Sequence, residues 1–144
     1  MGRGGTLMIG DSITSALIQK ALDGTWQRQK AISNNIANHE TPGYKAVRVS
    51  FEQELKNQVQ RLQNTSNNAQ SGKSKLSEGL ASIRNSKIRF STDRSTSERA
   101  DGNNVNLDFE NIQMAKAQIQ YQYLTRAITD YYARLRHAIS EGKR

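Results

Sequence analysis

Apolar residues recur at alternating steps of three and four through the last third of the chain. Between Met114 and Ala138 the steps are 3, 4, 3, 4, 3, 4 and 3, the spacing that lines one face of a coiled-coil helix. Leu107 extends the pattern backwards, with Asn106 or Asp108 available as N-cap. The predicted seam comprises Leu107, Met114, Ala117, Tyr121, Leu124, Ile128, Tyr131, Leu135 and Ala138. Because a single seam cannot bury itself, this helix requires partner helices.

A weaker apolar stripe predicts a second long helix near the N-terminus. Asp11 or Ser12 is available to cap its start. The run Thr41-Pro42-Gly43 ends it, because the residue before proline avoids the α conformation and glycine tolerates positive φ. We expect Trp26 to pack within the stripe. The packing residues predicted for this helix are Ile18, Leu22, Ile32 and Ile36.

The sequence between these helices is polar and weakly patterned. Residues 57–79 are dominated by Asn, Gln, Ser and Lys, a composition typical of a flexible or conditionally ordered segment. Residues 45–55 alternate weakly between apolar and polar, the run 87–92 predicts a short strand, and Asp101-Gly102-Asn103-Asn104 predicts a turn into the last helix.

These patterns predict a mainly α fold. Two long terminal helices form a coiled coil, and a polar, partly disordered connector with a short β segment joins them. The last helix carries too long a seam for the first to cover alone, so we expect helices of neighbouring subunits to complete the packing. The predicted boundaries are a flexible N-terminus over 1–11, a helix over 12–40, a turn and connector over 41–106, a heptad helix over 107–140 and a tail over 141–144.

The composition predicts a thin core. Leu, Ile, Val and Phe together number 28 of 144 residues, and the net charge is +8, values at which a chain orders mainly on association. We therefore expect an incompletely folded monomer. The chain lacks cysteine, which excludes disulfides and thiolate metal sites. Its sequence also has no apolar run long enough for a membrane span or a signal peptide, so any export must follow another route.

The charge and the titratable residues bear on two other functional classes, nucleic-acid-binding proteins and enzymes. Cations between Lys56 and Arg99 are spread among Ser, Asn and Gln with a single aromatic, which favours a solvated segment and predicts no nucleic-acid partner. A basic coiled-coil nucleic-acid-binding protein is the alternative function. His39 and His137 lack a second histidine at helical spacing, and no nucleophile motif accompanies them. We predict no catalytic residue, no metal, no cofactor and no enzymatic activity.

The densest local signal is the string NNIANHETPGYK. Asn34 and Asn38 lie one helical turn apart, so their amides can bond to backbone groups or to adjacent helices. Tyr44 follows the turn, where it either folds back onto the helix or docks in a neighbour. The predicted assembly residues are Asn34, Asn35, Ile36, Ala37, Asn38, Thr41, Pro42, Gly43, Tyr44 and Lys45.

This string resembles the N-terminal signature of the bacterial flagellar axial proteins, the family of rod, hook and hook-associated proteins. The resemblance continues through residues 22–29 and 51–55, and it returns in residues 101–108 and the last helix. The short chain and the DGNNV sequence before that helix are similar to the proximal-rod members of the family.

The resemblance implies a structural subunit of the flagellar basal body. Such a subunit passes unfolded through the flagellar type III export apparatus into the periplasm or cell-wall space, and it polymerises through paired terminal helices into the drive-shaft tube. The implied partners are other rod proteins, the rod-base adaptor and MS ring, and the export gate, in homo- and hetero-assembly. The turn over 41–45 is implied to contact a neighbouring subunit.

Overall fold

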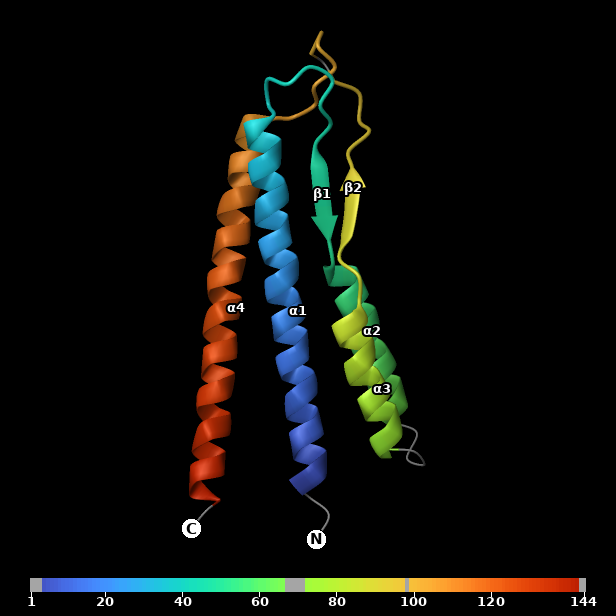
Figure 1. Cartoon of the computed structure of the whole chain (residues 1–144), viewed down its shortest axis with the longest axis vertical. Coiled ribbons are helices and arrows are strands. Elements are labelled where there is room, and N and C mark those ends of the chain that lie inside the picture. Colours follow the sequence, from blue (N-terminus) through green and yellow to red (C-terminus); the bar gives the residue numbers. More distant parts are fainter. Residues whose placement is uncertain (1–3, 67–71, 98, 143–144) are drawn as a thin grey trace. The chain divides into compact units, whose positions relative to one another are not determined.

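The computed structural model describes residues 4–66, 72–97 and 99–142. Long helices stand at both ends of the sequence, and a two-stranded sheet forms in the middle (Figure 1). The predicted mainly α fold with a short β segment is confirmed. The elements are α1 (Gly4–Ala37), β1 (Val47–Ser50), α2 (Glu52–Ser66), α3 (Gly72–Asn85), β2 (Arg89–Thr92) and α4 (Leu107–Glu141).

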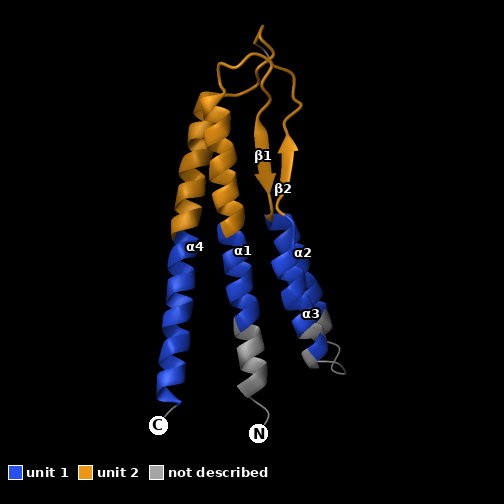
Figure 2. Ribbon diagram, viewed as in Figure 1, with its two compact units in different colours: residues 1–22, 52–87, 123–144 blue, residues 23–51, 88–122 orange. Residues whose placement is uncertain are grey.

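The chain divides into two compact units (Figure 2). Unit 1 comprises Met1–Leu22, Glu52–Lys87 and Tyr123–Arg144, and unit 2 comprises Asp23–Phe51 and Ile88–Gln122. Both long helices contribute to each unit, because the division falls within α1 and within α4.

In unit 2, β1 and β2 pair antiparallel, with Val47 opposite Thr92 and Ser50 opposite Arg89. The edge of β1 away from β2 is closed by side chains of α1. Arg28 donates from Nε and Nη2 to the carbonyl oxygen of Val49 at 3.3 and 3.1 Å. Successive residues of a strand direct their backbone N–H and C=O groups to alternate sides. Side chains of α1 therefore bond to the edge of β1 where a third strand would otherwise pair.

The core of unit 2 explains a glycine in the middle of α1. A Cβ on Gly24 would lie 2.4–2.7 Å from ring carbons of Phe51. Phe51 is buried, as are Ala31 and Ile32 on α1 and Val49 on β1. The aromatic ring therefore packs directly against the helix backbone, an approach that only a residue without a Cβ permits.

In unit 1, α2 and α3 pack against each other. Leu62 of α2 fills the space that a Cβ on Gly79 of α3 would occupy. Ser82 Oγ donates to Gln58 Oε1 at 2.7 Å, and Ile83 is fully buried. These contacts make residues 52–66 and 72–85 a helical pair.

The connector is thus more helical than its composition predicts. The reason is that contacts between the two helices stabilise them. Leu62 of α2 packs against Gly79 of α3, and the buried Gln58 of α2 accepts a hydrogen bond from Ser82 of α3. The residues between them, 67–71, lie outside the described residues.

The observed helix ends differ in detail from the predicted ones. α1 begins at Gly4, so neither Asp11 nor Ser12 is its cap and residues 4–11 are helical. It ends at Ala37 rather than residue 40. Asn106 is the N-cap of α4, since its Oδ1 accepts a hydrogen bond from the Phe109 amide at 3.0 Å. Residues 1–3 and 143–144 of the predicted flexible ends lie outside the described residues.

Candidate assembly site

Asn35 is fully buried near the end of α1 and links three parts of unit 2. Its Nδ2 donates to the Val47 carbonyl oxygen at 3.0 Å and to Glu110 Oε2 at 3.1 Å. Its Oδ1 accepts from the Val47 amide at 2.9 Å and from the Tyr44 hydroxyl at 3.2 Å. The side-chain amide therefore bonds to Val47 as a neighbouring strand would, and Tyr44 folds back onto its own helix.

Glu110 is fully buried in the first turn of α4, and two donors share its carboxylate. Arg48 Nη1 donates to Oε1, and Asn35 donates to Oε2. The guanidinium of Arg48 also lies 4.8 Å from the ring centroid of Phe109. A carboxylate near a helix N-terminus is electrostatically favourable, but a buried one requires its partners, because loss of either leaves charge or a donor unpaired.

Asp93 extends this charged cluster towards solvent. The Ser95 backbone amide donates to Asp93 Oδ1 at 2.9 Å, and Arg48 Nη2 lies 3.7 Å from Oδ2. Hydrogen bonds from the Ser95 amide and hydroxyl lower the pKa of Asp93 below its ordinary value, and the positive charges of Arg48 and Lys45 lower it further. The carboxylate is therefore ionised near neutral pH.

Asn103, in the turn before α4, holds the turn that follows α1. Its Nδ2 donates to the carbonyl oxygens of Asn38 at 2.9 Å and Thr41 at 2.8 Å. Its Oδ1 accepts from the Val105 amide at 2.8 Å. Asn103 is fully buried, so a single side chain from far along the sequence bonds to two carbonyl groups of the turn that follows α1. The Asn38 carbonyl also accepts from the Thr41 amide at 3.0 Å.

Asn104 places its side chain between Ala46 and Asp93, which adjoin the ends of β1 and β2. Its Oδ1 accepts from the Ala46 amide at 2.8 Å, and its Nδ2 donates to the Asp93 carbonyl oxygen at 2.9 Å. The Asp93 amide donates directly to the Ala46 carbonyl at 2.7 Å. Ala46 and Asp93 are therefore joined by one direct backbone hydrogen bond and by a second link in which the Asn104 side chain bridges the Ala46 amide and the Asp93 carbonyl.

The predicted assembly residues divide between interior and surface. Asn35 is buried, whereas Ile36, Asn38, Tyr44 and Lys45 are half-buried. Gly43 has a positive φ of 70°, and its amide donates to the Asp101 carbonyl at 2.8 Å, so it serves the turn. The exposed members are Asn34, Ala37, Thr41, Pro42 and Gly43.

The predicted seam is only partly covered within the chain. Of its α4 members, Ala117 is buried and Leu107, Tyr121 and Ala138 are exposed. The half-buried α4 members are Met114, Leu124, Ile128, Tyr131 and Leu135. On α1, Ile32 is buried, and the half-buried members are Ile18, Leu22 and Ile36.

Polar bonds accompany the seam in each unit. In unit 2, Gln29 Nε2 donates to the Ala117 carbonyl at 3.1 Å. In unit 1, Gln19 Nε2 donates to the Tyr132 hydroxyl at 2.9 Å, and that hydroxyl lies 3.0 Å from Ser15 Oγ. Within each unit, therefore, segments of α1 and α4 lie side by side and run in opposite directions.

A second apolar stripe runs along α4. Ile112, Ile119 and Tyr123 are 55%, 68% and 72% exposed, and their steps of seven and four place them on one helix face. At 100° per residue this face lies opposite the seam that contains Ala117. The heptad pattern of the seam does not include these three residues, so it did not predict this stripe. Trp26 of α1, predicted to pack within its stripe, is also 50% exposed in the single chain.

The sequence did not predict which residues bond to Asn35 and its turn. These partners are Arg48, Glu110, Asn103 and Asn104. A carboxylate in the first turn of a helix signals only a favourable helix dipole. The recurrence of family resemblance at residues 101–108 was the available signal, because it marked the segment that closes against the first motif.

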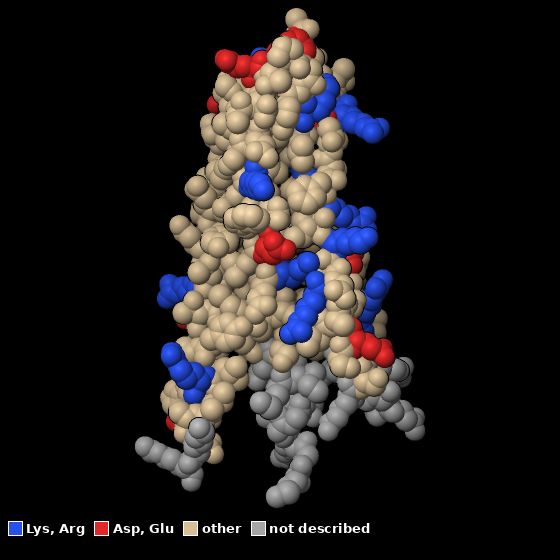
Figure 3. All heavy atoms as spheres, in the orientation of Figure 1, with Lys and Arg blue, Asp and Glu red and all other residues tan. Residues whose placement is uncertain are grey.

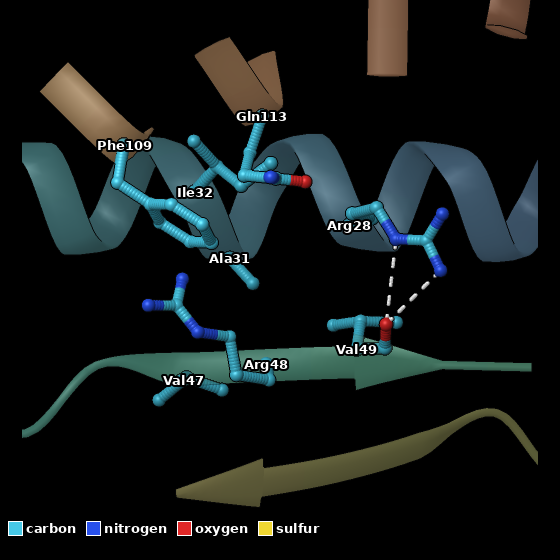
Figure 4. Close-up of a pocket in the computed structure, with 8 residues that line it drawn as sticks. All are labelled: Arg28, Ala31, Ile32, Val47, Arg48, Val49, Phe109 and Gln113. Atoms are coloured by element: carbon cyan, nitrogen blue, oxygen red, sulfur yellow. Dashed lines mark hydrogen bonds between the residues drawn. The ribbon is translucent and has the colours of Figure 1, made fainter. Parts of the chain in front are cut away.

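A cavity of about 320 Å³ lies beside this network, lined by residues of α1, β1 and α4 (Figure 4). Both of its arginines are already engaged. Arg28 donates to Val49, and its guanidinium lies 4.8 Å from the centroid of Phe51. Arg48 bonds to Glu110. The cavity is therefore a feature of helix-to-strand packing, and its cations serve the fold.

Other kinds of site find little support in the part of the chain that the structure describes. No group of three or more His, Cys, Asp or Glu side chains there could hold a metal ion. No helix among those residues has both the length and the apolar character needed to cross a membrane. On the face drawn in Figure 3, Lys and Arg form separate small groups rather than one basic stripe.

The comparisons with known proteins agree on one family. Its profile, described as flagella basal body rod protein, matches residues 14–45. The flagellar basal body rod protein FlgB of Bacillus subtilis is 32% identical over 126 residues, which cover 88% of this chain and 92% of the relative. FlgB of Buchnera aphidicola is 34% identical over 105 residues, 72% and 77% of the two chains. FlgB of Escherichia coli is 28% identical over 127 residues, 86% and 91%.

Long terminal helices, joined near Asn35 by a polar network, define a helical structural protein of the flagellar rod class. These matches span most of both chains, with identities that reach 34%. The chain belongs to the FlgB family of flagellar basal body rod proteins.

Proposed function

We propose that this chain is a structural subunit of the proximal rod and polymerises through its terminal helices into the drive-shaft tube. The observation that carries the proposal is the second apolar stripe of α4, formed by Ile112, Ile119 and Tyr123. A helix at the surface of a monomer needs one apolar face. A helix with two opposite apolar faces is suited to packing on both sides, and exposed apolar patches mark interaction surfaces.

The partly covered seam supports the same proposal. Leu107 and Tyr121 stay exposed, and most other seam members are half-buried. A tube of side-by-side subunits supplies apolar surface to such positions, because association buries what one chain leaves in water.

The turn after α1 is a further proposed contact. Thr41, Pro42 and Gly43 are exposed. Asn103 Nδ2 donates a hydrogen bond to the Thr41 carbonyl and so holds the turn in place. A rigid, exposed turn can bind a neighbouring subunit with little loss of conformational entropy on association.

The proposed partners are other rod proteins, the rod-base adaptor with the MS ring, and the export gate. Delivery through the flagellar type III apparatus requires an unfolded chain. The described core is small, and several of its residues are alanine or valine, which supports a subunit of low stability that unfolds readily.

Substitution of Ile119 by Asp tests the proposal. Ile119 is 68% exposed, so the charge should leave the helicity of the free chain unchanged and yet abolish swimming when the variant replaces the native gene. Gln118→Asp is the matched control: it is the exposed neighbour on the same helix but lies outside the stripe. Normal swimming by the Ile119→Asp strain would overturn the proposed role of this face.

A further inference from the structure

Strand β2 has one paired edge and one open edge. Ser91 lies opposite Arg48, and the Asp93 amide donates to the Ala46 carbonyl. The odd-numbered residues of β2 therefore direct their backbone groups towards β1, and Phe90 and Thr92 direct theirs away. Among the described residues, no hydrogen bond reaches the backbone groups of Phe90 or Thr92. β2 lies on the side of β1 away from α1 (Figures 1 and 4).

The sheet can extend only at this edge. Asn35 and Arg28 of α1 occupy the outer edge of β1 through Val47 and Val49. A two-stranded sheet is marginal by itself, and an open strand edge is a template for another strand. Phe90, which is 57% exposed, adds an apolar side chain to the open strand.

The sequence of β2 is complementary to itself in one antiparallel register. With Ser91 opposite Ser91 of a second copy, Phe90 faces Thr92 of that copy and the two residues exchange both backbone hydrogen bonds. Arg89 then faces Asp93 of the second copy, twice in each pair. Arg89 has no ion pair among the described residues, and the Asp93 side chain is 31% exposed. The two Phe90 rings become diagonal neighbours on one face of the sheet.

We propose that β2 pairs with β2 of a second copy of this chain, antiparallel and centred on Ser91, to form one continuous sheet across two subunits. The pairing goes beyond the proposed rod function. It buries a small area, so it is reversible. Because a two-fold contact closes on itself whereas a head-to-tail contact propagates, the pairing belongs to the free subunit.

Single-cysteine variants test the register directly, since the chain has no cysteine of its own. Ser91→Cys places two thiols at a non-hydrogen-bonded pair, about 4.5 Å apart at Cα, within the range for a disulfide. Thr92→Cys keeps the thiol on the same edge but opposite Phe90. Ser50→Cys places it on the exposed end of β1. We expect Ser91→Cys to form disulfide dimers several-fold faster than either control at equal concentration.

Sedimentation velocity over a concentration series tests the charge pairs. Arg89→Asp places a carboxylate opposite Asp93 and should weaken dimerisation several-fold, whereas Lys87→Asp makes the same charge change outside the paired residues and should alter it little. Equal disulfide rates for the three cysteine variants, faster oxidation of Thr92→Cys, or equal effects of the two charge reversals would overturn the pairing. Motility is not the readout, so this proposal and the rod proposal fail separately.

Discussion

At the scale of single residues, an asparagine side chain both donates and accepts hydrogen bonds, which neither an ionised aspartate nor a leucine can do. The position of Asn35 requires a side chain that donates to the Val47 carbonyl and to Glu110. The same side chain must accept from the Val47 amide and the Tyr44 hydroxyl. A carboxamide meets this need because it presents two N–H donors and a carbonyl oxygen with two lone pairs in one plane. The same property places Asn104 between the Ala46 amide and the Asp93 carbonyl.

Asn35→Asp should destabilise the chain by about 3 kcal/mol, because it removes two donors and sets a second carboxylate against buried Glu110. Urea unfolding followed by circular dichroism at 222 nm measures the change. Asn34→Asp is the matched control, since Asn34 is the exposed neighbour, and it should shift the midpoint little. Similar midpoints for the two variants would show that the buried network contributes nothing.

Asp93 predicts a dependence of stability on pH. Its folded pKa lies below the ordinary value of 3.8 because of the Ser95 hydrogen bonds and the Arg48 charge. A depressed pKa contributes stability that is fully present above the unfolded pKa and is lost as pH falls through the folded pKa. Asp93→Asn should therefore lower the free energy of unfolding more at pH 7 than at pH 3.

The control for this prediction keeps the carboxylate and removes one of its hydrogen bonds. Ser95→Ala deletes the hydroxyl and leaves the backbone amide, so it should reproduce only part of the loss at pH 7. A difference between native and Asp93→Asn chains that does not change with pH would contradict the assigned cause.

At the scale of elements, local sequence patterns predict the helices and turns that local interactions determine. The heptad spacing from Met114 to Ala138 predicts α4, and Pro42 marks the turn after α1. The pairing of Arg48 with Glu110 spans 62 residues, and no spacing rule connects them. The helices α2 and α3 were hidden by their polar composition, because contacts such as Leu62 with Gly79 depend on the partner helix.

Among the residues that the structure describes, the helical glycines Gly24 and Gly79 both have close neighbours, and substitution should affect them differently. Gly24→Ala forces a Cβ into the rigid ring of Phe51 and should destabilise the chain by about 1–3 kcal/mol. Gly79→Ala meets mainly the end of the Leu62 side chain, which can rotate, so a helix-propensity gain of up to about 1 kcal/mol offsets the strain. Thermal unfolding of both variants checks the contrast. Equal destabilisation would show that Leu62 cannot move.

At the scale of the whole molecule, the two faces of α4 have different consequences. Most of the seam members are half-buried within the chain, whereas Ile112, Ile119 and Tyr123 face solvent. Sequence periodicity predicted the seam residues, but which helix face a single chain leaves open depends on how α1 and α4 lie within each unit. The seam pattern alone therefore could not predict the second apolar stripe.

Leu124→Asp and Ile128→Asp should each abolish swimming and also lower the helicity of the free chain. A charge at a half-buried seam position lacks a partner. It should cost about 3 kcal/mol in every subunit once neighbouring subunits cover it. Soft-agar motility and circular dichroism measure the two effects. Gln122→Asp, at an exposed position on the same helix, should preserve both. Swimming that survives both seam substitutions would contradict the rod proposal.

The hydrogen bonds of Asn103 and Asn35 also set an order of events during synthesis. The turn after α1 is held by a side chain 65 residues after Asn38, and Asn35 bonds to Glu110, which lies 75 residues after it. Because a ribosome delivers the N-terminus first, the turn after α1 lacks its bonds from Asn103 until about three quarters of the chain has emerged. Contacts of such long sequence separation form late and slowly. A product that ends before Asn103 therefore lacks the side chain that holds this turn.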